Sequence, residues 1–183
     1  MLVRRQSAMV VGLMCGVLAV GGCSGTETGT AQPSTDTAAA TAALWDPCTQ
    51  IPDSTLTGLG LGVGSKRSGI LGVEEPGWKI CRWDDAEFPS GWGIGVYSTI
   101  HTIAEVRAKP TNIEFKDVVI GGRSGVQFRQ SHYDADEDCS IAFSTASGLA
   151  QLDLLNTGVQ AKTVPPCERL QPIAEAIVPL FPK

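Results

Sequence analysis

Four cysteines constrain this fold most, because they follow an N-terminal segment typical of exported proteins. They are Cys48, Cys81, Cys139 and Cys167, and no two of them have a Cys-x-x-Cys spacing. An even number of cysteines in an oxidising compartment predicts disulfides, and the wide spacing argues against a zinc site. We therefore expect a fold held together by two disulfide bonds.

Four cysteines can pair in three ways. We favour Cys48 with Cys81 and Cys139 with Cys167, which closes loops with sequence separations of 33 and 28 residues. Each such bond contributes about 3 to 4 kcal/mol in the chain-entropy account of disulfide stabilisation. The two other pairings stay open at the level of the sequence.

The N-terminus predicts export followed by cleavage. Two arginines precede twelve uncharged, mostly apolar residues at 9–20. This length suits the core of a signal peptide and falls short of the roughly twenty residues that a membrane-spanning helix needs. Two glycines and Cys23 follow, so that the segment resembles a bacterial lipobox. The resemblance implies cleavage after residue 22, acylation of Cys23 and a protein anchored by lipid to the outer face of the cell membrane.

The charge of the chain argues against nucleic acid as a partner. The sequence has 14 Lys and Arg against 19 Asp and Glu, and cleavage after residue 22 leaves 12 against 19. An acidic chain lacks the positive footprint that binds phosphate backbones, and anionic lipid headgroups repel it. We therefore expect the membrane to be bound through the acyl chains alone, which hold firmly when two or more are attached.

The composition divides the chain into three parts. Residues 1–22 form the predicted signal peptide. Residues 23–43 comprise the acylated cysteine and a Thr/Ala-rich linker, in which no aromatic or large aliphatic side chain follows Cys23. Such a linker is a flexible tether with a root-mean-square span of about 25 Å. Residues 44–183 form a single domain, which begins with the large apolar side chains of Leu44 and Trp45.

Periodicity within this domain predicts an α+β fold. We expect helices over 53–59, with Asp53 as the N-cap, over 103–107, capped by Thr102 and ended by Pro110, and over 167–180. We expect strands at 79–83, 92–98, 116–120, 123–130, 139–144 and 149–155. This order of elements is typical of an antiparallel sheet covered by helices.

Several short motifs together resemble a known family. They are LWDPC at 44–48, GWKICRW at 77–83, GGRSG at 121–125, the late Cys139, and a Pro-Cys pair at 166–167 that opens the last helix. With the lipobox-like segment, they are similar to the actinobacterial lipoproteins grouped as domain of unknown function 3558. The resemblance implies an exported, acyl-anchored envelope protein of mycobacterium-like bacteria with two structural disulfides. It implies no activity.

The sequence shows no convincing catalytic, metal or cofactor site. Ser131 and His132 are neighbours, and neighbours on an extended segment point to opposite faces. The acidic run at 134–138 has Cys139 where a calcium loop needs glycine, and Thr145 where it needs a bidentate glutamate. We therefore expect no catalytic residue, no metal and no cofactor.

Tryptophans gather in the first half of the chain, at positions 45, 78, 83 and 92. They either pack beside the disulfides or form an open aromatic patch. For the second case we predict a binding surface of Trp78, Arg82 and Trp83, with Arg123 as a further cation for an anionic ligand.

We expect a non-enzymatic binding or interaction module that engages an envelope protein or glycolipid. One alternative is a carrier of envelope lipid, which needs a cavity lined by an apolar sheet face. Another is an envelope hydrolase, which needs two pocket carboxylates about 5 to 10 Å apart.

Overall fold

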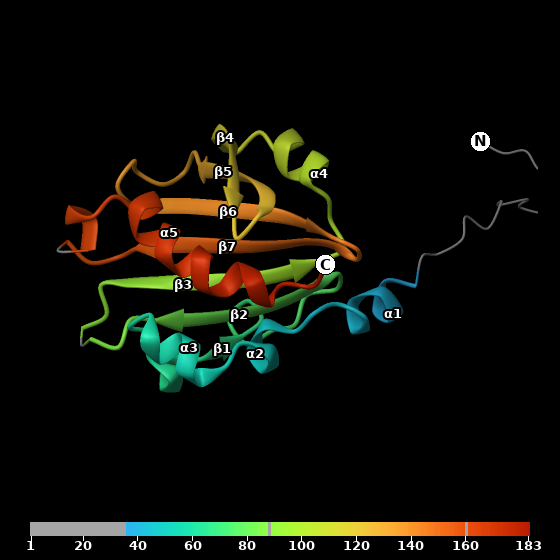
Figure 1. Cartoon of the computed structure of the whole chain (residues 1–183), viewed down its shortest axis with the longest axis horizontal. Helices are drawn as coiled ribbons and strands as arrows, with labels where there is room; N and C mark the ends of the chain where they lie inside the picture. Colours follow the sequence, from blue (N-terminus) through green and yellow to red (C-terminus); the bar gives the residue numbers. More distant parts are fainter. Residues whose placement is uncertain (1–35, 88, 160) are drawn as a thin grey trace, which may run out of the picture. The chain divides into compact units, whose positions relative to one another are not determined.

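The computed structural model describes residues 36–87, 89–159 and 161–183. The predicted signal peptide and Cys23 lie outside the described residues. The described part of the chain forms one antiparallel sheet of seven strands in the order β1-β2-β3-β7-β6-β5-β4 (Figure 1). At the centre of the sheet, β3 pairs with β7 from a distant part of the sequence, whereas β6 and β7 are consecutive.

The strands are β1 Arg67–Ser68, β2 Trp78–Asp84, β3 Trp92–Thr99, β4 Asn112–Ile120, β5 Arg123–Gln130, β6 Asp138–Thr145 and β7 Gly148–Asn156. The α-helices are α1 Thr37–Ala42, α2 Pro47–Gln50, α3 Asp53–Gly58, α4 Ile103–Ala108 and α5 Pro166–Ile177, and the 3-10 turns are η1 Val63–Ser65, η2 Ala161–Thr163 and η3 Val178–Leu180. The predicted α+β class and antiparallel sheet are confirmed. Within the described ranges, no helix combines the length and the apolar character needed to cross a bilayer.

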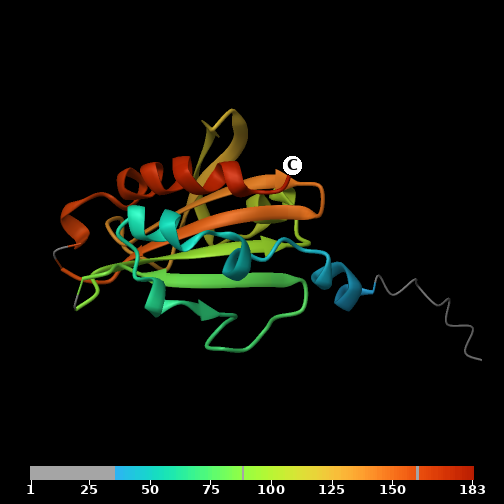
Figure 2. The same cartoon turned by 60° about the horizontal axis from the view of Figure 1, so that its bottom comes forward.

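The two faces of the sheet have different surroundings. Helices α2, α3 and α5 cover one face, as the edge-on view in Figure 2 shows. Side chains alternate between the faces of each strand. Thus the buried Val96, Ile141 and Leu152 belong to the core under these helices. We call the opposite face the open face. At one end of this face, Ile103 and Val106 of α4 pack on the cluster around Phe128.

Two disulfides tie the helices to the sheet. Cys48 in α2 bonds to Cys81 in β2, and Cys139 in β6 bonds to Cys167 in the first turn of α5. This is the favoured pairing, and it is confirmed. Short helices such as α2 gain little stability from their own hydrogen bonds. The covalent tie therefore fixes its position on the sheet.

The structure departs from the sequence-based expectation at two helix starts. The predicted flexible tether reaches to Ala43, but its described end, from residue 36 on, contains α1. Asp36 caps this helix by accepting hydrogen bonds from the amides of Ala38 and Ala39, and alanine favours the helical state. In α3, Pro52 occupies the N-cap position predicted for Asp53. Asp53 lies in the first turn instead, where its charge complements the helix dipole.

Candidate functional site

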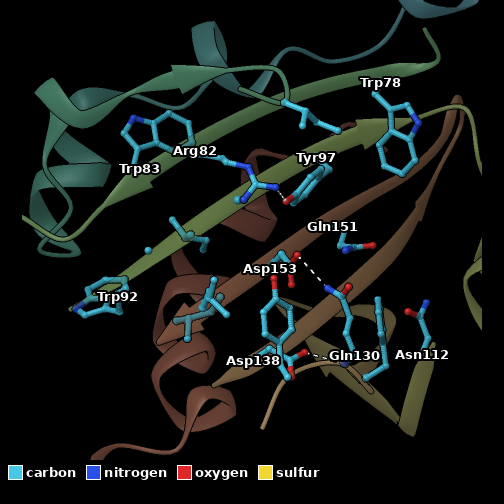
Figure 3. Close-up of a pocket in the computed structure, with 18 of the residues that line it drawn as sticks. Trp78, Arg82, Trp83, Trp92, Tyr97, Asn112, Gln130, Asp138, Gln151 and Asp153 are labelled. Atoms are coloured by element: carbon cyan, nitrogen blue, oxygen red, sulfur yellow. Dashed lines mark hydrogen bonds between the residues drawn. The ribbon is translucent and has the colours of Figure 1, made fainter. Parts of the chain in front are cut away.

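A pocket of about 800 Å³ lies on the open face of the sheet. Arg67 in β1 and Ile70 just after it line one side of the pocket, and residues of α4 line the other. Its floor comes from the central strands. The residues that matter for the following argument are Trp78, Arg82, Tyr97, Gln130, Gln151 and Asp153. Figure 3 shows these side chains as they enter the pocket from β2, β3, β5 and β7.

Two glycines in β3 make room for this pocket. Gly93 and Gly95 line the pocket. They alternate along the strand with Ile94 and Val96, which belong to the core. A Cβ on Gly95 would lie 2.6 Å from ring atoms of Tyr97. The tyrosine ring therefore lies flat across its own strand, which a side chain at position 95 would prevent.

A chain of polar groups crosses the floor of the pocket. Arg82 donates from Nη2 to the Tyr97 hydroxyl at 2.6 Å, and its guanidinium carbon lies 5.5 Å from the centre of the tyrosine ring. On the next strand, Asp153 accepts hydrogen bonds from Gln130 Nε2, at 3.3 Å, and from the Ser140 hydroxyl (Figure 3). The pocket thus presents a cation, a phenol, an amide and a carboxylate in one row.

Burial shifts the pKa values of two groups in this row. It raises the pKa of the Asp153 carboxyl, and this effect exceeds the lowering by the hydrogen bond from Ser140 and by the charge of Arg82. Burial, with the nearby charge of Asp153, also raises the pKa of the Tyr97 phenol. Tyr97 therefore keeps its proton at neutral pH and can donate a hydrogen bond.

A second carboxyl group, that of Asp138, also lines the pocket, although its residue is almost fully buried. Its residue is 1% exposed, and its Oδ2 accepts a hydrogen bond from the amide of Gln130 at 2.8 Å. Its Oδ1 lies 3.6 Å from Nη2 of Arg129. Burial raises the pKa of this carboxyl group too. Asp138 thus holds β5 and β6 together, while Asp153 is the more accessible acid.

Aromatic rings form one wall of the pocket. The ring of Trp78 stands at 82° to that of Tyr97, with 6.2 Å between centroids, and it lies 5.2 Å from the ring of His101. His101 contacts Glu105 at 3.0 Å. This contact, followed by hydrogen bonds from Thr102, lowers the pKa of Glu105 to about 2. The cap of α4 therefore holds the histidine beside Trp78.

The structure separates the predicted binding residues. Trp78 and Arg82 line the pocket. Trp83 also borders the pocket, but as the neighbour of Arg82 on the strand it takes the other face, and the residue is 1% exposed in the core beneath the helices. Arg123 donates from Nη2 to the carbonyl of Pro182 at 2.7 Å, and so holds the C-terminal segment instead of lining the pocket.

Tyr97, Gln130 and Asp153 were not predicted from the sequence. For Asp153, the signal is the regular return of polar side chains, such as Gln151 and Asp153, in the otherwise apolar run at 148–156. Alternation of this kind normally indicates a solvent-facing side of a strand. That these polar groups lie in the same pocket follows only from the order of the strands in the sheet.

The other sequence motifs have structural partners. In the acidic run, Glu137 pairs with Lys162 at 2.7 Å and Asp138 is buried as described above. Among the residues that the structure describes, no group of three or more His, Cys, Asp or Glu side chains could hold a metal ion.

Comparisons with known proteins identify a family without an activity. Residues 18–180 match the model of a family described as "Protein of unknown function (DUF3558)". Neither the search of curated proteins nor that of solved structures gave a match. The functional argument therefore depends on the pocket itself.

Proposed function

Because the chain belongs to the DUF3558 family, whose description assigns no activity, we propose a function from its own residues: an acyl-anchored lipoprotein of an actinobacterial envelope that binds a hexose-type sugar. The pocket on the open face of the sheet is its binding site. The observation that carries this proposal is the row from Arg82 through Tyr97 to Asp153 beside the ring of Trp78.

The lipoprotein part of the proposal rests on the N-terminal sequence. The two arginines, the apolar run at 9–20 and the glycines before Cys23 occur in the order that lipid attachment requires. Two disulfides in the described domain fit an oxidising compartment outside the cytoplasm. Cys23→Ala should release the protein into the medium or leave an uncleaved precursor, whereas unchanged membrane partition would contradict acylation at this residue.

The pocket has the chemistry that a sugar needs. A pyranose ring carries hydroxyl groups that both donate and accept hydrogen bonds around its edge, and C–H groups on its faces. Asp153 accepts, Arg82 donates, and the neutral Tyr97 phenol does both. The ring of Trp78 offers a flat apolar surface for the C–H groups. Such a mixture of aromatic walls and few convergent polar groups is typical of small-molecule sites.

An acyl chain fits this pocket poorly, which weighs against the alternative of a lipid carrier that holds its cargo in an apolar cavity. A hydrocarbon ligand would remove water from Arg82 and Asp153 without replacing its hydrogen bonds. Each unpaired polar group of this kind costs roughly 1 to 3 kcal/mol, and a charged one costs more. The same groups become partners when the ligand carries hydroxyls.

Hydrolysis is the second candidate, because Asp138 and Asp153 both contact Gln130. A glycosidase needs two carboxyl groups that reach the scissile bond. Asp138 is 1% exposed and is bound by Arg129 and the Gln130 amide. Its enclosure favours binding over hydrolysis.

Titration with simple sugars tests the proposed site. The acylated protein in detergent is mixed with methyl pyranosides of glucose, mannose and galactose, and tryptophan fluorescence is followed, since Trp78 and Trp92 line the pocket. We expect a saturable change with at least one sugar. Asp153→Asn should weaken binding by about 10- to 100-fold, because a hydrogen bond to a charged group contributes about 1.5 to 3 kcal/mol.

The matched control is Asp117→Asn, which makes the same chemical change on strand β4 at a side chain that is 86% exposed. It should bind as the unchanged protein does. The sugar-binding proposal is wrong if no pyranoside changes the fluorescence up to its solubility limit. Release of sugar from nitrophenyl pyranosides that depends on Asp153 would instead favour the hydrolase.

A further inference from the structure

Exposed apolar side chains gather at a tight turn between β1 and β2. Ile70, Leu71 and Val73 are 46%, 100% and 61% exposed. The amide of Ile70 donates to the carbonyl of Val73 at 2.8 Å, and the amide of Val73 donates back at 2.9 Å. We call residues 70–73 the apolar hairpin. These two hydrogen bonds hold Leu71 at the tip, where it is fully exposed.

The backbone at this tip is unusual for a leucine. Leu71 has a φ of 53° and Gly72 has a φ of 82°, so both central residues of the turn are left-handed. Asn-Gly is the pair that suits such a turn, and a bulky residue with positive φ is a genuine outlier. A polar residue would fit both the backbone and the solvent better. The strain and the exposure together indicate that the Leu71 side chain acts outside the domain.

The connection that carries the apolar hairpin ends beside the helix where the chain enters the domain. In Figures 1 and 2, helix α1 lies near the part of this connection that leads into β2. The amide of Gly77, in this connection, donates to Thr41 Oγ1 in α1 at 2.7 Å. The first described residue, Asp36, follows Cys23 by 13 positions. The covalent geometry of the backbone limits the reach of such a segment to at most about 45 Å.

We infer that the apolar hairpin inserts its side chains into the surface of the bilayer that holds Cys23. The inference rests on the acyl anchor and the sugar pocket of the proposed function. Ile70 also lines the pocket, so the inserted hairpin would place the pocket mouth at the lipid surface. A hexose head group could then enter the pocket while its lipid tail stays in the membrane.

Two observations favour lipid over a protein partner. Three side chains on one turn are far fewer than the 20 to 30 residues per side of a stable protein interface, which buries roughly 800 Å² on each partner. Side chains that enter a lipid surface need no such area. Lys66 and Arg67 precede the hairpin and Glu74 and Glu75 follow it, so the flanking charges cancel and offer no net attraction to anionic headgroups. Insertion should therefore occur in zwitterionic membranes and be insensitive to salt.

A polarity-sensitive dye on the hairpin tests the contact. The full acylated protein with Leu71→Cys is labelled at the new thiol and reconstituted into phosphatidylcholine vesicles. The matched control is Val119→Cys, since Val119 is 69% exposed and lies on β4, the edge strand opposite β1. We expect a blue shift of the dye at position 71 and quenching by a lipid-borne quencher, at low and high salt, with neither effect at position 119.

The outcomes separate the hairpin from the anchor. If both proteins float with the vesicles but the two dyes behave alike, the apolar hairpin does not contact lipid. A blue shift that occurs in native membranes and not in protein-free vesicles would indicate a protein partner and overturn the inference. If neither protein floats, the proposed anchor is wrong, and the hairpin inference falls with it.

Discussion

The ring of Tyr97 lies across the α-carbon of Gly95, so close that a Cβ at position 95 would be 2.6 Å from ring atoms. The pocket floor therefore depends on a glycine. Gly95→Ala should displace the ring, lower the free energy of unfolding by about 1 to 3 kcal/mol and weaken sugar binding. Urea unfolding and fluorescence titration measure the two effects.

Gly58→Ala is the control for this substitution. Gly58 ends helix α3, and a Cβ there would meet nothing within 4 Å. This variant should keep the stability and the binding of the unchanged protein. If Gly95→Ala behaves like Gly58→Ala, then the position of the Tyr97 ring does not shape the pocket.

Sugar binding should depend on pH through Asp153. Its pKa is raised by burial, and the ionised carboxylate is the form that accepts two hydrogen bonds from a ligand without donating. Affinity should therefore fall as the pH decreases through this raised pKa, above the ordinary range near 4. Titrations of methyl glucoside across the acid range check this, and Asp153→Asn should remove the dependence. A wild-type affinity that is flat with pH would contradict the role of Asp153.

The same carboxyl group affects stability with the opposite sign. A pKa that is raised on folding means that the folded state favours the protonated acid, so this contribution to stability is lost as the pH rises through the folded pKa. Relative to the unchanged protein, Asp153→Asn should therefore gain stability from acid to neutral pH. Urea unfolding at several pH values measures this difference.

The strand pattern was predictable because it follows from local alternation. The run at 92–98 alternates glycine and polar residues with apolar ones, and it became β3 with one residue added. The cap of α4 was equally clear, since Thr102 and Glu105 form a capping box. The residues that make up such a signal are close together in the sequence, so the element can be predicted without knowing the fold.

The site was not predictable in the same way. Tyr97 and Asp153 meet because β3 pairs with β7, 56 residues later in the sequence, and no local pattern reports that pairing. The two-residue strand β1 was missed as well, since it exists only through its hydrogen bonds to β2. Trp83 was grouped with Arg82 in the predicted binding surface, but neighbours on a strand take opposite faces, and Trp83 packs in the core.

The disulfide between Cys139 and Cys167 should stabilise the domain markedly. It closes a loop with a sequence separation of 28, for which the chain-entropy account gives about 3.5 kcal/mol. The double substitution Cys139→Ala and Cys167→Ala should lower the free energy of unfolding by about this amount in urea. Equal unfolding midpoints for the variant and the unchanged protein would show that the bond contributes nothing.

Leu71 should be dispensable for folding. Glycine at this position relieves a left-handed conformation that costs a residue with a side chain about 1 to 2 kcal/mol. This gain offsets the entropy cost of a glycine, roughly 0.5 to 1 kcal/mol. Leu71→Gly should therefore unfold at the same or a higher urea concentration. A clearly lower midpoint would indicate that Leu71 supports the fold instead of a contact outside it.

The central claim is that the pocket row holds a sugar, and mass spectrometry of the acylated protein purified from its own envelope tests it most directly. The pocket variant carries both Trp78→Ala and Arg82→Ala. The control variant is Asp117→Asn, which lies outside the pocket. The account predicts a stoichiometric adduct with hexose units on the unchanged protein and the control, and its loss from the pocket variant. An adduct that the pocket variant retains, or one that is a fatty acid without sugar, would contradict the account.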